Sequence, residues 1–129
     1  MSTLVAQTIS NGTVSTSSAN VIQGSAKAWV NFNGSTATAR ASYNVSSITR
    51  NGNCDYTVNF TNAFADANYS TVATANAALG QGACATLAFG GLGGTAGSLY
   101  STTQVEIFVQ NTNGSRSTDV TMLNVACFR

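Results

Sequence analysis

The sequence predicts an all-β domain, and three observations support this prediction. Several segments alternate apolar and polar residues with the period of two that a half-buried strand requires. Asn-Gly steps, which favour the tight turns of β-hairpins, occur four times. The chain has no Pro, and no segment sustains the period of 3.6 residues expected of an amphipathic helix. We therefore expect a compact antiparallel β-sandwich or jelly-roll-like domain.

The composition indicates one domain with a thin core. The 129 residues suit a single domain, and Val, Ile, Leu and Phe together make up about a fifth of them. The net charge of +1 is too low for the self-repulsion that keeps many chains disordered. A core formed between subunits would compensate for the small number of large apolar side chains, so we expect a trimer. A lone monomer is the alternative.

The first segment is expected to be an extended N-terminal arm over residues 1–23, followed by the β-sandwich domain over residues 24–129. Leu4–Ile9 has the pattern of a short strand, and Asn11-Gly12 offers a turn before a polar run of Ser and Thr. The arm would attach the protein to another protein or to a neighbouring subunit. A loosely ordered terminus is the alternative.

The next predicted strand is Ala26–Phe32, which has one apolar face and one polar face. Trp29 lies on the polar face with Lys27 and Asn31. An aromatic side chain there indicates a ligand or subunit contact, or a site covered by another element of the same fold, and the covered site is the more frequent case. Asn33-Gly34 offers a second hairpin turn, but it would place Lys27 opposite Arg40, and this like-charge pair disfavours the register.

The hairpin centred on Asn51-Gly52 is the most specific local prediction. It joins two alternating segments, Ala41–Thr49 and Asp55–Thr61, through a type I′ turn. This register pairs three residues of the first segment with three of the second on one face: Tyr43 with Phe60, Val45 with Val58, and Ser47 with Tyr56.

Four further strands are expected along the second half of the chain. They are Tyr69–Ala75, Cys84–Phe89, Gln104–Gln110 and Asp119–Phe128. A turn at Asn113-Gly114 would pair the last two, with Ile107 opposite Val120 and Val105 opposite Met122. Because the chain ends inside a strand, Arg129 is expected near the body of the fold. The Gly-rich region between Asn76 and Ser98 is predicted to be an exposed loop, and it is the favoured region for recognition of a host surface.

The residue inventory argues against catalysis and cofactor binding. The chain has no His, which excludes His-based triads and most catalytic zinc sites. Its four acidic residues show no pattern that clusters them into a carboxylate pair or a calcium loop: Asp55, Asp66, Glu106 and Asp119. We therefore expect no enzyme activity, no metal and no cofactor.

Three cysteines, Cys54, Cys84 and Cys127, lack the paired spacing of a metal site. Arg50 is near Cys54 in the sequence, but without a His base we expect structural roles for the thiols. Free thiols are expected, with a Cys54–Cys84 bridge as the alternative.

The remaining function class is recognition by neutral side chains. No basic patch is present for nucleic acid, no apolar run is long enough for membrane insertion, and we see no signal peptide. Asn, Ser, Thr and Tyr offer donors and acceptors, and aromatic rings can stack on sugars. That chemistry suits a surface glycan, and it suits an ordinary solvated β surface equally well.

Two phrases, AKAWVNFNG from Ala26 and ASYNVSSITRNGNCDYTVNFTNAFADANY from Ala41, resemble tail-fibre-like virion proteins of tailed bacteriophages, many of them marine. The start, TISNGTVSTSSANVIQGSAKAWVNF, and the end, VTMLNVACFR, resemble the same family. Residues 76–118 match it poorly. The family usually has a small residue, often Gly, where Cys54 stands.

The resemblance implies a virion structural protein that is made in the host cytoplasm and forms a homo-oligomer, with trimers usual for fibres. Its partners would be other virion proteins of the tail or capsid, and a host cell-surface glycan or protein. A tail fibre or receptor-binding component is the favoured function. A capsid decoration or head-fibre protein is the alternative, and a depolymerase is disfavoured for lack of clustered acids. No motif of the family carries catalytic residues to this chain.

Overall fold

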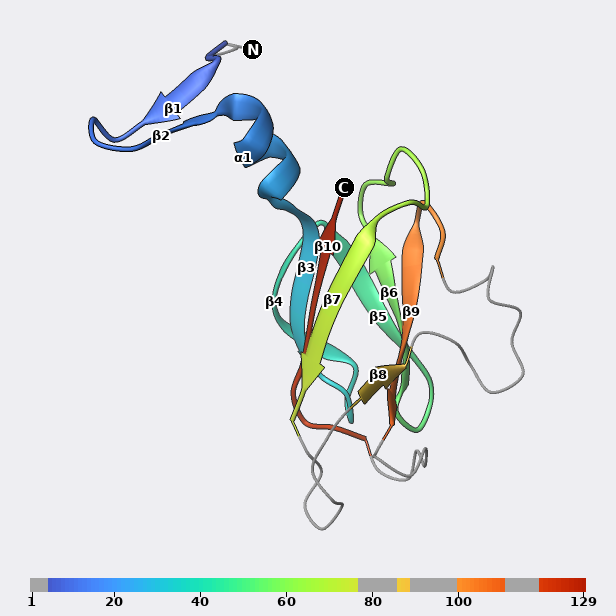
Figure 1. Cartoon of the computed structure of the whole chain (residues 1–129). Coiled ribbons are helices and arrows are strands. Elements are labelled where there is room, and N and C mark those ends of the chain that lie inside the picture. Colours follow the sequence, from blue (N-terminus) through green and yellow to red (C-terminus); the bar gives the residue numbers. More distant parts are fainter. Residues whose placement is uncertain (1–4, 77–85, 89–99, 111–118) are drawn as a thin grey trace.

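A computed structural model of the chain describes residues 5–76, 86–88, 100–110 and 119–129 (Figure 1). The predicted all-β class is confirmed, because the described elements are ten strands and one short helix, and every strand pairing is antiparallel.

Two four-stranded sheets contain most of the strands. The first, here called Sheet I, has the order β4-β3-β10-β7, and the second, Sheet II, has the order β5-β6-β9-β8. The strands of Sheet I are β3 (Ala26–Asn33), β4 (Thr38–Tyr43), β7 (Ser70–Ala75) and β10 (Leu123–Phe128). Those of Sheet II are β5 (Val45–Gly52), β6 (Asp55–Phe60), β8 (Thr86–Ala88) and β9 (Gln104–Gln110).

Both sheets bury side chains in one hydrophobic cluster. Alternate residues of the inner strands supply it: Ala28, Val30, Phe32, Leu123, Val125 and Cys127 from Sheet I, and Tyr56, Val58, Phe60, Val105, Ile107 and Val109 from Sheet II. The predicted apolar face of β3 is therefore confirmed at Ala28, Val30 and Phe32, whereas Ala26, the fourth alternate residue, is only partly buried. The rings of Phe32 and Tyr56 meet edge to face, with centroids 5.3 Å apart, and so join the two sheets directly.

Asn44 divides the predicted strand Ala41–Thr49 in two. It has a φ of 55°, a left-handed conformation that Asn tolerates better than most residues. The strand before it, β4, belongs to Sheet I, and the strand after it, β5, belongs to Sheet II. The predicted single strand is wrong because one residue of positive φ turns the chain from one sheet into the other.

The hairpin of β5 and β6 forms, but its predicted register is wrong. Gly52 pairs with Asp55, so the turn is Asn53-Cys54, and Cys54 has a φ of 57°. Shifts in the ladder near Ser46 and Asn51 place Val45 opposite Phe60 and Ile48 opposite Val58. These irregularities let both Val45 and Ile48 pack against the core, which the regular period of two does not allow.

The hairpin of β3 and β4 also differs from the register that Asn33-Gly34 suggests. The turn spans residues 34–37, and Trp29 pairs with Tyr43 rather than with a residue near the turn. Lys27 and Arg40 are consequently not opposed. Gly34 is required by close packing, because a Cβ there would lie 2.3 Å from the Tyr56 hydroxyl and 2.6 Å from the Val120 carbonyl oxygen.

The predicted pairing of the last two strands is wrong. β9 pairs with β6 and β8, whereas β10 pairs with β3 and β7, so Ile107 and Val120 do not face each other across a hairpin. The final strand begins at Leu123 rather than Asp119. Alternation reveals that a segment is a strand, but two equally apolar strands give no indication of their partners. Asn113-Gly114 lies outside the described residues.

The N-terminal segment forms a hairpin and a helix that lead away from the sheets (Figure 1). Strands β1 (Thr8–Ser10) and β2 (Ser15–Ser17) pair through a turn in which Gly12 has a φ of 91°. The sequence predicted no helix, yet α1 (Ser18–Gly24) follows, with the Ser17 hydroxyl accepting the Asn20 N–H as an N-cap. None of the helix residues is buried. Within the described residues, no helix is both long and apolar enough to cross a membrane.

Candidate functional site

The candidate site is the face of Sheet I that points away from the core. Strand register places side chains of this face in rows across the sheet. One row is Tyr43, Trp29, Ala126 and Val72, and the next is Ala41, Asn31, Asn124 and Thr74. The first row is apolar and the second is mainly polar, so the face has two chemically distinct bands.

A shallow groove of about 340 Å³ lies on this face between β3 and β7. Trp29 and Val72 stand on either side of the small Ala126, because each is the direct cross-strand neighbour of Ala126. Trp29 is 40% exposed and Val72 is 56% exposed. The groove therefore has an aromatic wall, an aliphatic wall and a low floor.

Three polar side chains form a hydrogen-bonded line along one end of the groove. The Asn31 amide Nδ2 donates to Asn124 Oδ1 at 2.5 Å, and Asn124 Nδ2 donates to Thr74 Oγ1 at 3.2 Å. These bonds fix the orientation of both amides. Each side-chain amide has two N–H donors, and within the described part of the chain Asn31 and Asn124 each donate only one of the two. The second donor of each amide is therefore available to a ligand.

Among the described residues that line the groove, none has a titratable side chain. Arg40 stands near its polar end, where its guanidinium donates to Asn31 Oδ1 at 3.5 Å and to the Thr121 carbonyl oxygen at 2.6 Å. Lys27, on the same strand as Trp29, donates to the carbonyl oxygen of Ile22 in α1. The groove itself therefore suits an uncharged group.

The position of Trp29 corrects one expectation. Trp29 lies on the polar face as predicted, but the expectation that another element covers it is wrong, given its exposed surface. In the sequence, this site is marked by the single Trp, which lies among polar residues on one face of the strand. Val72, Asn124 and Ala126 were not recognised as site residues, because their proximity to Trp29 depends on the non-local pairing of β10 with β3 and β7.

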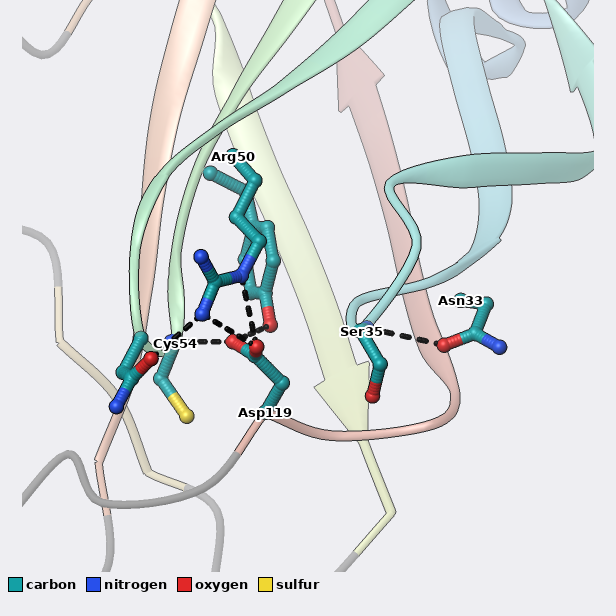
Figure 2. A network of polar contacts seen from close by, with 7 residues as sticks. Asn33, Ser35, Arg50, Cys54 and Asp119 are labelled. Carbon is teal, nitrogen blue, oxygen red and sulfur yellow. Dashed lines mark hydrogen bonds and ion pairs between the residues drawn. The ribbon is translucent and has the colours of Figure 1, made fainter.

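Asp119 is the centre of a second polar cluster, shown in Figure 2. Its Oδ1 accepts hydrogen bonds from the Cys54 N–H and the Tyr56 hydroxyl, both at 2.8 Å, and its Oδ2 accepts one from Arg50 Nε at 2.7 Å. Burial disfavours the charged carboxylate, but these donors outweigh burial and lower the pKa of Asp119. Burial, together with the bond to Asp119, raises the pKa of Tyr56.

This cluster has a structural role. It ties the β5–β6 turn to the segment just before β10, and all of its charged groups are engaged with one another. Cys54 occupies the turn with a φ of 57°, a left-handed backbone conformation that Gly adopts more readily than other residues.

Two of the four acids come together on the outer face of Sheet II. The Asn51 amide Nδ2 donates to Asp55 Oδ1 at 3.0 Å and to Thr57 Oγ1 at 2.9 Å, and it lies 3.5 Å from Glu106 Oε1. Sequence reasoning found no clustering of acids, because Glu106 reaches this point only through the β6–β9 pairing. Across the described ranges, no group of three His, Cys, Asp or Glu residues forms a candidate metal site.

Cys127 and the Arg129–Asp66 ion pair have structural roles, the first in the core and the second at the surface. Cys127 is buried among core side chains, burial raises its pKa, and its sulfur lies 3.6 Å from Thr71 Oγ1. Arg129 forms an ion pair with Asp66, which holds the end of the chain against the fold as predicted. Cys84 lies outside the described residues, so the free thiol expected there, and the alternative of a bridge with Cys54, stay untested.

The predicted recognition loop between Asn76 and Ser98 falls mainly outside the described residues. Asn76 itself extends the β7–β10 pairing, because its side chain bonds to the Met122 N–H and to Thr121 Oγ1, both at 2.9 Å. The assignment of this loop to host recognition stays a prediction.

The chain was compared with protein-family models, with curated proteins and with solved structures, and none of the three comparisons found a match.

Proposed function

We propose that this protein is a bacteriophage virion structural protein, specifically a tail fibre or receptor-binding component on the particle surface. The observation that carries the proposal is the open groove beside Trp29, where an exposed aromatic side chain lies next to oriented amides on the outer face of Sheet I. Such a site is typical of a surface that contacts a ligand. The resemblance of Ala26–Gly34 and Ala41–Tyr69 to tail-fibre-like proteins supplies the biological setting.

The architecture proposed for this function is a β-sandwich of Sheets I and II with an N-terminal attachment segment. The shared core of the two sheets supports the sandwich. The attachment role is supported by large apolar side chains that are exposed along the N-terminal segment: Val5, Ile9, Val14, Val21 and Ile22. Exposed apolar residues of this kind commonly mark a protein contact. Their partner would be another virion protein or a second copy in a homotrimer.

The second candidate function is a capsid decoration or head-fibre protein that coats the particle. The same N-terminal apolar residues favour it, because attachment to a capsid shell needs an exposed contact segment as much as attachment to a tail does. The two functions differ in whether the groove has a ligand outside the particle. In either case the protein is proposed to be made in the host cytoplasm and to end in the virion, with no catalytic role and no cofactor.

Immunogold labelling of the phage that encodes the protein tests the proposal. Antibodies against the purified protein are applied to intact particles, with antibody preabsorbed on the protein as the control. Label at the tail supports the receptor-binding function, and label spread over the capsid supports the decoration function instead. Absence of the protein from purified particles, by labelling and by mass spectrometry, would overturn both.

A further inference from the structure

The shape of the groove limits what can occupy it. Its floor is Ala126, and its walls are Trp29 and Val72 on the neighbouring strands. A flat sheet from a second copy would contact Trp29 and Val72 but would not reach Ala126 between them. The groove would stay empty, and the interface would not be closely packed. A volume of about 340 Å³ is at the lower end of the range for small-molecule sites, so it suits a single ring with its substituents.

The chemistry of the groove requires a ligand with an apolar face and polar edges. The indole of Trp29 presents a flat apolar surface whose π face attracts C–H groups that carry a small positive charge. At the end of the groove, Asn31 and Asn124 each offer an N–H, held in place by the bonds that orient the two amides. A purely apolar ligand would displace water from these donors without replacing its hydrogen bonds, which costs affinity.

We infer that the groove binds a pyranose ring of a surface glycan. The C–H face of the ring lies on Trp29, and its hydroxyl groups accept hydrogen bonds from Asn31 and Asn124. A sugar ring has both an apolar face and hydroxyl edges, and it needs no charged partner in the groove. Because the groove is open, the rest of the glycan extends into solvent. This inference rests on the proposed function, since it names the ligand class of the same surface.

The chain has one tryptophan, so its intrinsic fluorescence reports this site directly. The full chain is titrated with methyl pyranosides of glucose, galactose, mannose, rhamnose and N-acetylglucosamine, and binding is followed by Trp29 fluorescence and by saturation-transfer NMR. A single ring held by one aromatic face and two donors is expected to bind with a Kd on the order of 1 mM.

Ala126→Leu fills the floor of the groove and is expected to weaken binding at least about tenfold, because the ring no longer reaches the indole. Ala41→Leu is the matched control. Ala41 is paired with Asn31 on the same face, at the edge strand, so the same enlargement there should leave binding unchanged. Trp29→Phe keeps a flat ring and should bind within a few fold of the wild type. Trp29→Leu keeps apolar surface but has no flat face, so it should lose binding by NMR.

Three results would overturn the inference. The first is the absence of any pyranoside signal in the wild type at concentrations about tenfold above the expected Kd. The second is pyranoside binding that Ala126→Leu leaves intact. The third is a fall in oligomeric state, measured by sedimentation, in both Ala126→Leu and Trp29→Leu, which would assign the face to a contact between copies. None of these results changes the particle labelling, so failure here is distinguishable from failure of the virion assignment.

Discussion

The hydroxyl of Tyr56 donates a 2.8 Å hydrogen bond to Asp119 Oδ1, and so connects two residues that are 63 positions apart. The Asp119 side chain is 11% exposed and also pairs with Arg50. Asp119→Asn removes the charge and leaves the guanidinium without its carboxylate, so we expect the free energy of unfolding to fall by about 2–3 kcal/mol. Urea unfolding measures this. Asp66→Asn, which breaks the exposed pair with Arg129, is the control and should have a much smaller effect.

The same contacts predict an acid dependence of stability. The pKa of Asp119 is lower in the folded chain than its ordinary value of 3.8, so the carboxylate stabilises the fold above that pH. This contribution is lost as the pH falls through the lowered folded-state pKa. The stability difference between wild type and Asp119→Asn should therefore be constant near neutral pH and shrink below about pH 4. A difference that grew on acidification would contradict the assignment.

Gly34→Ala is expected to destabilise the protein by about 1–3 kcal/mol or more, because the new Cβ would meet the Tyr56 hydroxyl and the rigid backbone at Val120. Thermal unfolding measures the loss. Gly24→Ala is a matched control, since a Cβ at Gly24 meets no atom within 4 Å. Equal effects of the two substitutions would show that close packing at Gly34 is not the cause.

Substitutions of Asn44 can separate two contributions to stability, the cost of its left-handed backbone and the hydrogen bonds of its side chain. Its side chain donates to the Lys27 and Asn62 carbonyl oxygens and accepts the Asn62 N–H, at 3.0, 3.2 and 2.8 Å. Asn44→Gly loses these hydrogen bonds, but Gly adopts the left-handed backbone readily. Asn44→Ala loses the same bonds and is also unfavourable in that backbone conformation. We expect Asn44→Ala to be the less stable variant by about 1 kcal/mol, as measured by urea unfolding. Equal stability would indicate that the φ of Asn44 carries no cost.

Removal of residues 1–24 should leave the two sheets folded. The described residues of β1, β2 and α1 are not buried, and their main link to Sheet I is the bond from Lys27 to Ile22. We expect the truncated chain to unfold within a few degrees of the full chain and to keep the Trp29 fluorescence spectrum. If the N-terminal segment makes a subunit contact, sedimentation will show a lower oligomeric state for the truncated chain than for the full chain. A loss of cooperative unfolding would contradict the prediction.

Local patterns predicted the strands well but not their partners. Gln104–Gln110 matches β9 at both ends, and Asp55–Phe60 and Ser70–Ala75 lie within the predicted ranges. The Asn51-Gly52 turn failed because the sequence signal for a two-residue turn competes with the burial of Val45 and Ile48, and burial determined the register. The helix α1 was missed because its seven residues make only about two turns, none of them is buried, and so short a segment shows no apolar period.

The site was only partly predictable for the same reason. Trp29 stood out as an aromatic residue on a polar strand face, which needs only local sequence. Ala126 and Val72 complete the groove through pairings between distant segments, and nothing in their local sequence marks them. The Asp119 cluster was likewise hidden, since Arg50, Tyr56 and Asp119 meet through tertiary contacts alone.

β10 is the last strand in the sequence, yet it lies in the middle of Sheet I, between β3 and β7. Asn31 and Asn124, which bond across this pairing, are 93 positions apart. We expect so distant a contact to form late, because the entropy of closing the intervening loop must be overcome first. During translation, the strand that lies between β3 and β7 is absent until the residues of β10 have been made. The groove, whose floor is Ala126, therefore requires a chain synthesised through β10, and any product that terminates earlier lacks it.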